Sequence, residues 1–205
     1  MKKYLSLFLV VFLAGSLLLL SACAGKESDN DTQPTPEQTD KTAFTGTADE
    51  ILNQLISKTI EKNVLAVEEL KDITCYNKEI DADSCLDILG LTPEKFAADV
   101  ASAVEAKPEG SWFAHSIVVV KIKDGVDAAA LADQISKGTN PARFGCIKAE
   151  TVVVGYAGQY ILLCASFQTT SDAIYTTFSE LSAVASIRID RENDWNDGGL
   201  VGLGQ

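Results

Sequence analysis

Histidine is almost absent from this sequence, which contains His115 and no second imidazole. A Ser-His dyad would have to use His115, yet its neighbour Ser116 would point to the opposite face of a strand. The sequence also lacks the GxSxG, SxxK and HExxH motifs. A thiol nucleophile such as Cys146 paired with His115 stays open, although nothing local supports it. We expect instead that His115 is half-buried and hydrogen-bonded near the start of a strand.

Motifs for metals, thiol exchange and phosphate binding are missing as well. There is no CxxC pair, so neither thioredoxin-type exchange nor a zinc ribbon is indicated. The acidic run at residues 190–197 has oxygen-bearing side chains at alternate positions, as a calcium loop does. However, Trp195 occupies the position of the turn glycine and Val201 that of the final glutamate. We therefore predict no metal site and no cofactor.

The one long hydrophobic run lies at the N-terminus, where two lysines precede residues 4–20 and the small residues Ser21 and Ala22 follow. This layout is typical of a secretory signal peptide. The run is also nearly as long as the roughly 20 apolar residues that span a bilayer. An uncleaved membrane helix is therefore the alternative interpretation.

A cysteine ends this segment, in the sequence LSAC at residues 20–23. LSAC resembles the bacterial lipobox, and the resemblance implies that a diacylglycerol is attached to Cys23 and that the chain is cut just before it. We therefore predict a signal peptide over residues 1–22 and a lipid anchor on Cys23. The two acyl chains of a diacylglycerol are enough to hold a protein stably on a bilayer. The expected location is the extracytoplasmic face of the cell membrane.

Positive charge is scarce: 17 basic residues stand against 29 acidic ones, for a net charge of −12. Removal of residues 1–22 would leave 15 basic residues and a net charge of −14. Such a surface repels the phosphate backbone of nucleic acids. We predict no nucleic-acid partner and attribute the excess of acid to solubility.

The rest of the chain divides by composition. Residues 23–47 contain a single large apolar residue, Phe44, and cannot bury enough surface to offset chain entropy, so we expect a disordered polar linker. Residues 48–189 have the patterns of one globular domain. Residues 190–205 have the composition of a flexible acidic and glycine-rich tail.

Helix and strand signals alternate within the domain. Thr47 and Glu50 have the spacing of a capping box that begins a helix, and Thr92 with Pro93 begins another, which we expect to continue until Pro108. Further elements are a strand at 115–123, a helix at 127–138 ended by a left-handed Gly138, a hairpin at 150–167 that turns at Ala157 and Gly158, and a helix at 171–186 capped by Thr170 or Ser171.

This order predicts an α+β fold, in which N-terminal helices precede a β-α-β-β-α unit that forms a small mixed or antiparallel sheet packed with helices. The three strands are almost continuously apolar, which implies cover on both faces of the sheet. We expect the two helices between and after the strands to cover one face, and the N-terminal helices to cover part of the other.

Three segments resemble a known family: LDILGLTPEKFAADVASA, HSIVVVKIKDGVDAAALADQI and GYAGQYILLCAS. In order and spacing they are similar to a family of small bacterial surface lipoproteins, found mostly in Gram-positive bacteria, that is defined only as a domain of unknown function. The resemblance implies a compatible architecture and carries no activity or catalytic residue. The chain departs from the family in having four cysteines in its domain.

Those four cysteines form an even set once Cys23 is lipidated, and disulfides are permitted outside the cytoplasm. Four cysteines allow three pairings. Local loop closure favours Cys75 with Cys85, which we take as the candidate disulfide, and Cys146 with Cys164 is the less favoured second pair. Cys164 also fits a small buried apolar position.

Two functions of different class follow from these observations. The favoured one is a non-catalytic binding or interaction module, displayed on the membrane and directed at an envelope protein, a wall polymer or a small ligand through a sheet edge or a groove. The alternative is a cell-envelope hydrolase or transferase that uses carboxylate acid-base chemistry. Two facing buried carboxylates would favour the enzyme.

Overall fold

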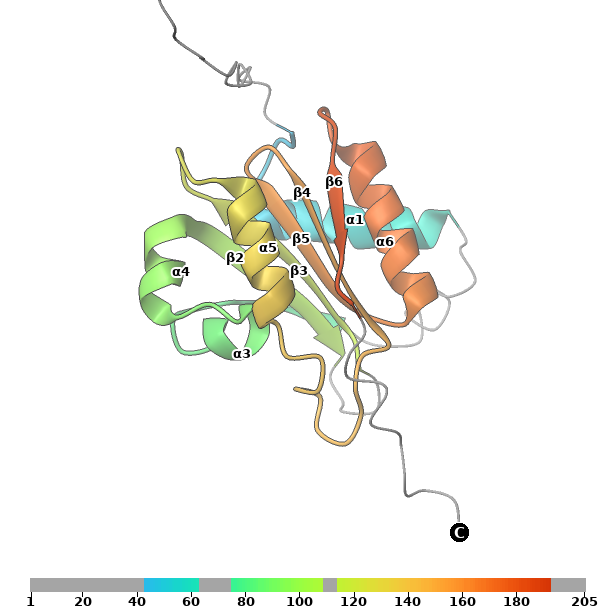
Figure 1. Cartoon of the computed structure of the whole chain (residues 1–205). Coiled ribbons are helices and arrows are strands. Elements are labelled where there is room, and N and C mark those ends of the chain that lie inside the picture. Colours follow the sequence, from blue (N-terminus) through green and yellow to red (C-terminus); the bar gives the residue numbers. More distant parts are fainter. Residues whose placement is uncertain (1–42, 63–74, 109–113, 193–205) are drawn as a thin grey trace, which may run out of the picture. The chain divides into compact units, whose positions relative to one another are not determined.

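The computed structural model describes residues 43–62, 75–108 and 114–192. Within these ranges the chain forms five helices and a six-stranded sheet (Figure 1). The helices are α1 (Ala48–Glu61), α3 (Cys85–Leu89), α4 (Pro93–Asp99), α5 (Ala128–Gly138) and α6 (Gln168–Leu181). The strands are β1 (Cys75–Glu79), β2 (Val100–Pro108), β3 (Ser116–Ile122), β4 (Thr151–Ala157), β5 (Tyr160–Ser166) and β6 (Ile187–Asp190).

All neighbouring strands are antiparallel, in the order β1-β2-β3-β5-β4-β6. This arrangement confirms the predicted α+β class. The hairpin is confirmed with a shifted turn, because Gly158 and Gln159 connect β4 to β5 and Val153 lies opposite Cys164. Gly158 supplies the left-handed backbone of this turn, with a φ of 53°.

Helices cover both faces of the sheet, so the core has two parts (Figure 1). α1 and α6 pack on one face, where Leu52 and Phe178 are fully buried. α3 and α5 pack on the other face through Leu89 and Leu131, and α4 lies against β2 on that side. The central strands β3, β4 and β5 are buried along almost their whole length, as their continuous apolar sequences predict.

The prediction that the two helices interleaved with the strands share one face is wrong. α5 packs on one face through Ile135, whereas α6 packs on the opposite face through Ile174. The physical reason is that β3, β4 and β5 carry apolar side chains alternately on both sides. Each face therefore needs its own helix, and α1 completes the cover of the α6 face.

The helix predicted to begin at Pro93 and to end before Pro108 is a short helix followed by a strand. Thr92 caps α4 as expected, since its hydroxyl accepts a hydrogen bond from the Lys95 amide at 3.3 Å. However, α4 has only seven residues, and β2 follows it directly.

The apolar spacing in this segment fits a strand buried on both sides as well as it fits a helix. In β2, Ala103 belongs to the core under α5 and Val104 to the core under α1. Pairing with β1 and β3 then satisfies the backbone of β2 on both edges. Tertiary pairing therefore outweighs the helical periodicity.

The ends of other elements also differ from the prediction. The capping box of α1 is confirmed, because the Thr47 amide donates to Glu50 at 2.8 Å and the Glu50 amide donates to Thr47 at 3.2 Å. In contrast, α6 begins three residues before the predicted start and has Phe167 at its cap. The strands β1 and β6 were not predicted, since each has a mixed polar sequence of five residues or fewer.

The glycine that ends a helix in the left-handed conformation is Gly90, which follows α3 and has a φ of 66°. Gly138, predicted for this role, is the last residue of α5 and does not have a positive φ. A Cβ added to Gly90 would lie 2.1 Å from the Gly138 carbonyl carbon. Two glycines therefore allow α3 and α5 to meet backbone to backbone.

Candidate functional site

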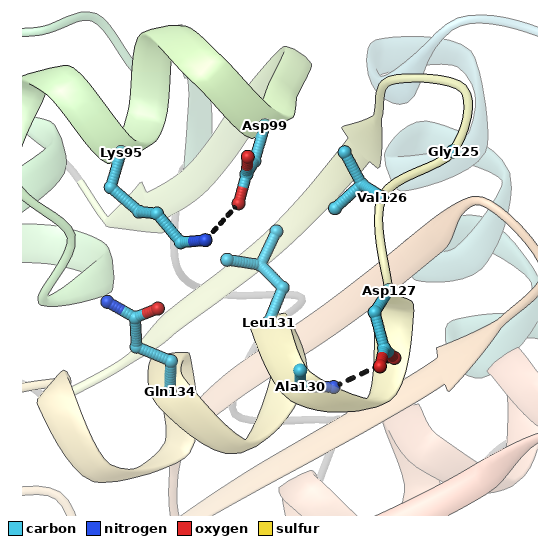
Figure 2. Close-up of a pocket in the computed structure, with 8 residues that line it drawn as sticks. All are labelled: Lys95, Asp99, Gly125, Val126, Asp127, Ala130, Leu131 and Gln134. Carbon is cyan, nitrogen blue, oxygen red and sulfur yellow. Dashed lines mark hydrogen bonds and ion pairs between the residues drawn. The ribbon is translucent and has the colours of Figure 1, made fainter.

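A groove of about 300 Å³ lies between α4, the loop after β3 and the first turns of α5. Figure 2 shows Lys95 and Asp99 reaching into it from α4, and Leu131 and Gln134 from α5. Its volume is at the small end of the range of ligand sites in proteins. The groove is thus large enough for a small molecule or for one segment of a polymer.

Polar groups of both signs line the groove around an aliphatic floor. The Lys95 ammonium lies 2.5 Å from the Asp99 carboxylate, which is only 15% exposed. Asp127 caps α5 by accepting hydrogen bonds from the amides of Ala129 and Ala130 at 2.9 and 3.1 Å. The arrangement can exchange hydrogen bonds with a polar ligand whose apolar part contacts Leu131.

A buried ion pair lies toward the C-terminal end of β2, away from the groove. The Glu105 side chain is 1% exposed and forms an ion pair with Arg143 from the loop after α5, whose side chain is 6% exposed. Ser116 donates a hydrogen bond to the same Glu105 oxygen at 2.6 Å. The Arg143 Nε has no hydrogen-bond partner among the described residues. The Glu105 side chain thus lies inside the protein beside the opposite charge of Arg143.

His115 lies at the same end of the sheet and is more buried than expected. It is 2% exposed, and its Nδ1 lies 2.8 Å from the Ser166 hydroxyl, while its Nε2 has no partner within the described part of the chain. Burial lowers the pKa of His115 to about 4. His115 is therefore neutral at physiological pH, and no described carboxylate or thiol forms a hydrogen bond with it.

This burial predicts that the protein loses stability as the pH falls from about 6.5 to 4. In that range the unfolded imidazole binds a proton that the folded one does not, so stability decreases by at most about 1.4 kcal/mol per pH unit. Above about pH 6.5 this residue contributes no pH dependence. Urea unfolding of the wild type and of His115→Asn across the range measures the difference, and parallel curves for the two proteins would contradict the prediction.

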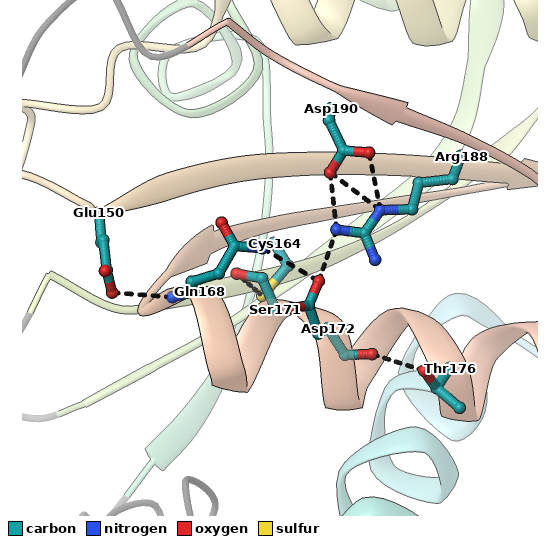
Figure 3. Close-up of polar contacts among 8 residues, drawn as sticks. All are labelled: Glu150, Cys164, Gln168, Ser171, Asp172, Thr176, Arg188 and Asp190. Carbon is teal, nitrogen blue, oxygen red and sulfur yellow. Dashed lines mark hydrogen bonds and ion pairs between the residues drawn. The ribbon is translucent and has the colours of Figure 1, made fainter.

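An ion network joins α6 to the edge strand β6 (Figure 3). Arg188 contacts Asp172 of α6 at 2.5 Å and reaches both oxygens of Asp190 through its Nε at 2.9 and 3.0 Å. Hydrogen bonds to Asp190 and to Asp172 raise the pKa of Arg188. At the start of α6, Glu150 accepts a hydrogen bond from the Gln168 amide at 2.9 Å.

The candidate disulfide cysteines lie in different surroundings. Cys85 is a buried thiol that donates to the Leu91 carbonyl at 3.3 Å, and Cys146 is an exposed thiol. Cys164 is buried beside Ser171, and burial raises its pKa to about 12. The Cys75 side chain lies outside the described part of the structure. Both candidate disulfides therefore stay predictions.

The predicted signal peptide and Cys23 also lie outside the described residues. No described helix is both long and apolar enough to cross a membrane. Across the described ranges, no group of three or more metal-ligating side chains comes together.

The sequence did not predict the groove or the buried Glu105–Arg143 ion pair. Glu105 could have been noticed as a lone charge inside the apolar segment ASAVEA, once that segment was recognised as a strand. Arg143 and the groove residues carry no such signal, because only the fold brings them to their partners. Compared with known protein families, curated proteins and solved structures, the chain shows no significant match.

Proposed function

We propose that this protein is a lipoprotein, anchored by Cys23 on the extracytoplasmic face of the cell membrane, whose domain is a non-catalytic binding module. The lipobox-like LSAC after an apolar run supports the anchor. Of the linker expected at 23–47, Ala43 and Phe44 are buried in the core with α1 and α6 and therefore belong to the domain. In this proposal the part of the linker before Ala43 separates the domain, with its N-terminal helix and its sheet, from the membrane surface.

The observation that supports the binding role is the set of partners of the buried Glu105 carboxylate. Acid-base hydrolysis by carboxylates needs two groups that face each other and titrate near neutral pH. Among the described residues, Glu105 is the only buried carboxylate, and its partners are a guanidinium and a hydroxyl. This pairing favours a binding module over the alternative envelope hydrolase or transferase.

The groove between α4 and α5 is the ligand site in this proposal. Its ammonium, carboxylates and amide suit a small polar molecule or a hydrophilic segment of a wall polymer. The acidic chain and the extracytoplasmic location make soluble wall-polymer fragments a suitable first probe. The alternative partner for the groove is an envelope protein that inserts a polar side chain into it.

Titration of the full chain with soluble wall-polymer fragments tests this proposal. We expect backbone amide NMR signals of Asp99, Val126 and Ala130 to shift on binding. Ala130→Trp fills the groove and should weaken binding at least tenfold, whereas Ala129→Trp, at the adjacent exposed position outside the groove, should not. Shifts confined to another surface would contradict the groove, and cleavage of the probe would favour the enzyme.

A further inference from the structure

The outer edge of β6 has a defined hydrogen-bonding pattern. The Arg191 amide donates to the Val152 carbonyl of β4 at 3.1 Å, and Ile189 lies opposite Val154. Backbone groups in an antiparallel ladder point alternately toward and away from the neighbouring strand. The amides and carbonyls of Arg188 and Asp190 therefore point away from β4, and β6 is the last strand on this side of the described sheet.

The side chains of these two outward residues carry opposite charges. They lie two positions apart, so they share one face of the strand. Arg188 is 26% exposed because it also contacts Asp172 and packs over the Tyr175 ring. Asp190 is 58% exposed and, within the described part of the chain, its carboxylate accepts hydrogen bonds from Arg188 alone (Figure 3). Its carboxylate is available for a second cation.

We propose that β6 pairs antiparallel with β6 of a second copy of this chain, centred on Ile189. In that register Arg188 lies opposite Asp190 of the second copy, and the reverse pair forms by symmetry. The outward backbone groups of both residues then exchange hydrogen bonds, which joins two six-stranded sheets into one. Residues on both partners are the same, as a two-fold interface requires.

Charge selects this register over its neighbours. Centring the pair on Arg188 places two guanidiniums opposite each other, and centring it on Asp190 places two carboxylates opposite each other. Only the register centred on Ile189 makes two ion pairs. A membrane anchor, which rests on the proposed function, would raise the local concentration and favour the contact.

The other edge of the sheet does not offer the same match. The Ile80 amide donates to the Ala103 carbonyl, so the backbone groups of Asn77 and Glu79 on β1 point outward. Self-pairing centred on Asn77 places Glu79 opposite Cys75, which forms no ion pair. Centring on Lys78 places two lysines opposite each other. Charge complementarity therefore identifies β6 as the edge that binds a second copy.

Cysteine cross-linking of the full chain tests this register. In the proposed dimer the two Ile189 residues face each other as a non-hydrogen-bonded pair, with Cα atoms about 4.5 Å apart, which is within disulfide range. In Ile189→Cys, diamide should oxidise the two thiols to one disulfide and be reduced to its hydrazine. Ile187→Cys is the matched control, because residue 187 faces Arg191 of the second copy and the two 187 positions are roughly 13 Å apart. We expect at least tenfold more dimer from Ile189→Cys, with peptide mapping that assigns the 189–189 link.

A charge exchange provides an independent test. Asp190→Arg alone and Arg188→Asp alone should each lower the dimer fraction in sedimentation, because each places like charges in opposition. A mixture of the two variants should restore dimers, since each variant complements the other. Equal cross-linking at 187 and 189, or dimers unchanged in both variants, would overturn the proposal. Capture of a different envelope protein by Ile189→Cys would also overturn it, whereas failure of the groove titration would not affect it.

Discussion

Replacement of Glu105 by glutamine is expected to lower the free energy of unfolding by about 3 kcal/mol. Glutamine keeps the shape and still accepts the Ser116 hydrogen bond, but it leaves the buried Arg143 guanidinium with only the exposed Asp87 carboxylate, 3.9 Å away, as a counter-charge. Removal of one partner of a buried ion pair costs roughly 3–5 kcal/mol for this reason. Urea unfolding at neutral pH, with the midpoint and slope compared between the two proteins, measures the change.

A second substitution separates charge from packing. Arg143→Met in the Glu105→Gln background removes the guanidinium that has lost its buried partner, so the double variant should be more stable than the single one. Glu79→Gln is the matched control, because Glu79 is an exposed glutamate on the neighbouring strand β1 and should change stability by less than about 0.5 kcal/mol. A double variant less stable than Glu105→Gln would show that the ion pair is not the cause.

Replacement of Cys23 by alanine is expected to abolish lipid attachment completely. Cys23 carries the only thiol of the lipobox-like segment LSAC, so no other side chain can take its place in the proposed reaction. Cells grown with a clickable fatty acid should label the wild-type protein and not Cys23→Ala. Intact mass should show a wild-type product that lacks residues 1–22 and a variant that retains them.

Cys146→Ala serves as the control for this experiment, because Cys146 is the exposed cysteine among the described residues. Its labelling should equal that of the wild type. Label that persists in Cys23→Ala, or a wild-type protein that begins at Met1, would refute the anchor and with it the proposed location. The uncleaved membrane helix would then be the better interpretation of residues 4–20.

Local chemistry made several elements predictable. Thr47 and Glu50 define the start of α1 because a capping box needs only two residues of the same turn. The central strand β3 and the β4–β5 hairpin follow from apolar runs separated by a glycine turn. The segment after Thr92 was predicted wrongly, because its apolar spacing fits a strand buried on both sides as well as a helix. Pairing with β1 and β3 decides between them.

The candidate site was less predictable than the fold. The groove lies between α4 and α5 on one face of the sheet, and Glu105 contacts Arg143 across 38 residues of sequence. No short-range pattern encodes such contacts, because they depend on which helix covers which face. The edge strand β6 is a similar case, because its four residues IRID are recognisable as a strand only from their pairing with β4.

The sequence by itself determined the features that act through neighbouring residues: the caps of α1 and α4, the apolar strands and the acidic charge. Only the tertiary structure decided the placement of α5 and α6 on opposite faces, the conversion of a predicted helix into β2, and the pairing of Glu105 with Arg143. The physical reason is range. Caps and turns are satisfied within a few residues, whereas burial and strand pairing are satisfied by whichever distant segment fills the remaining space.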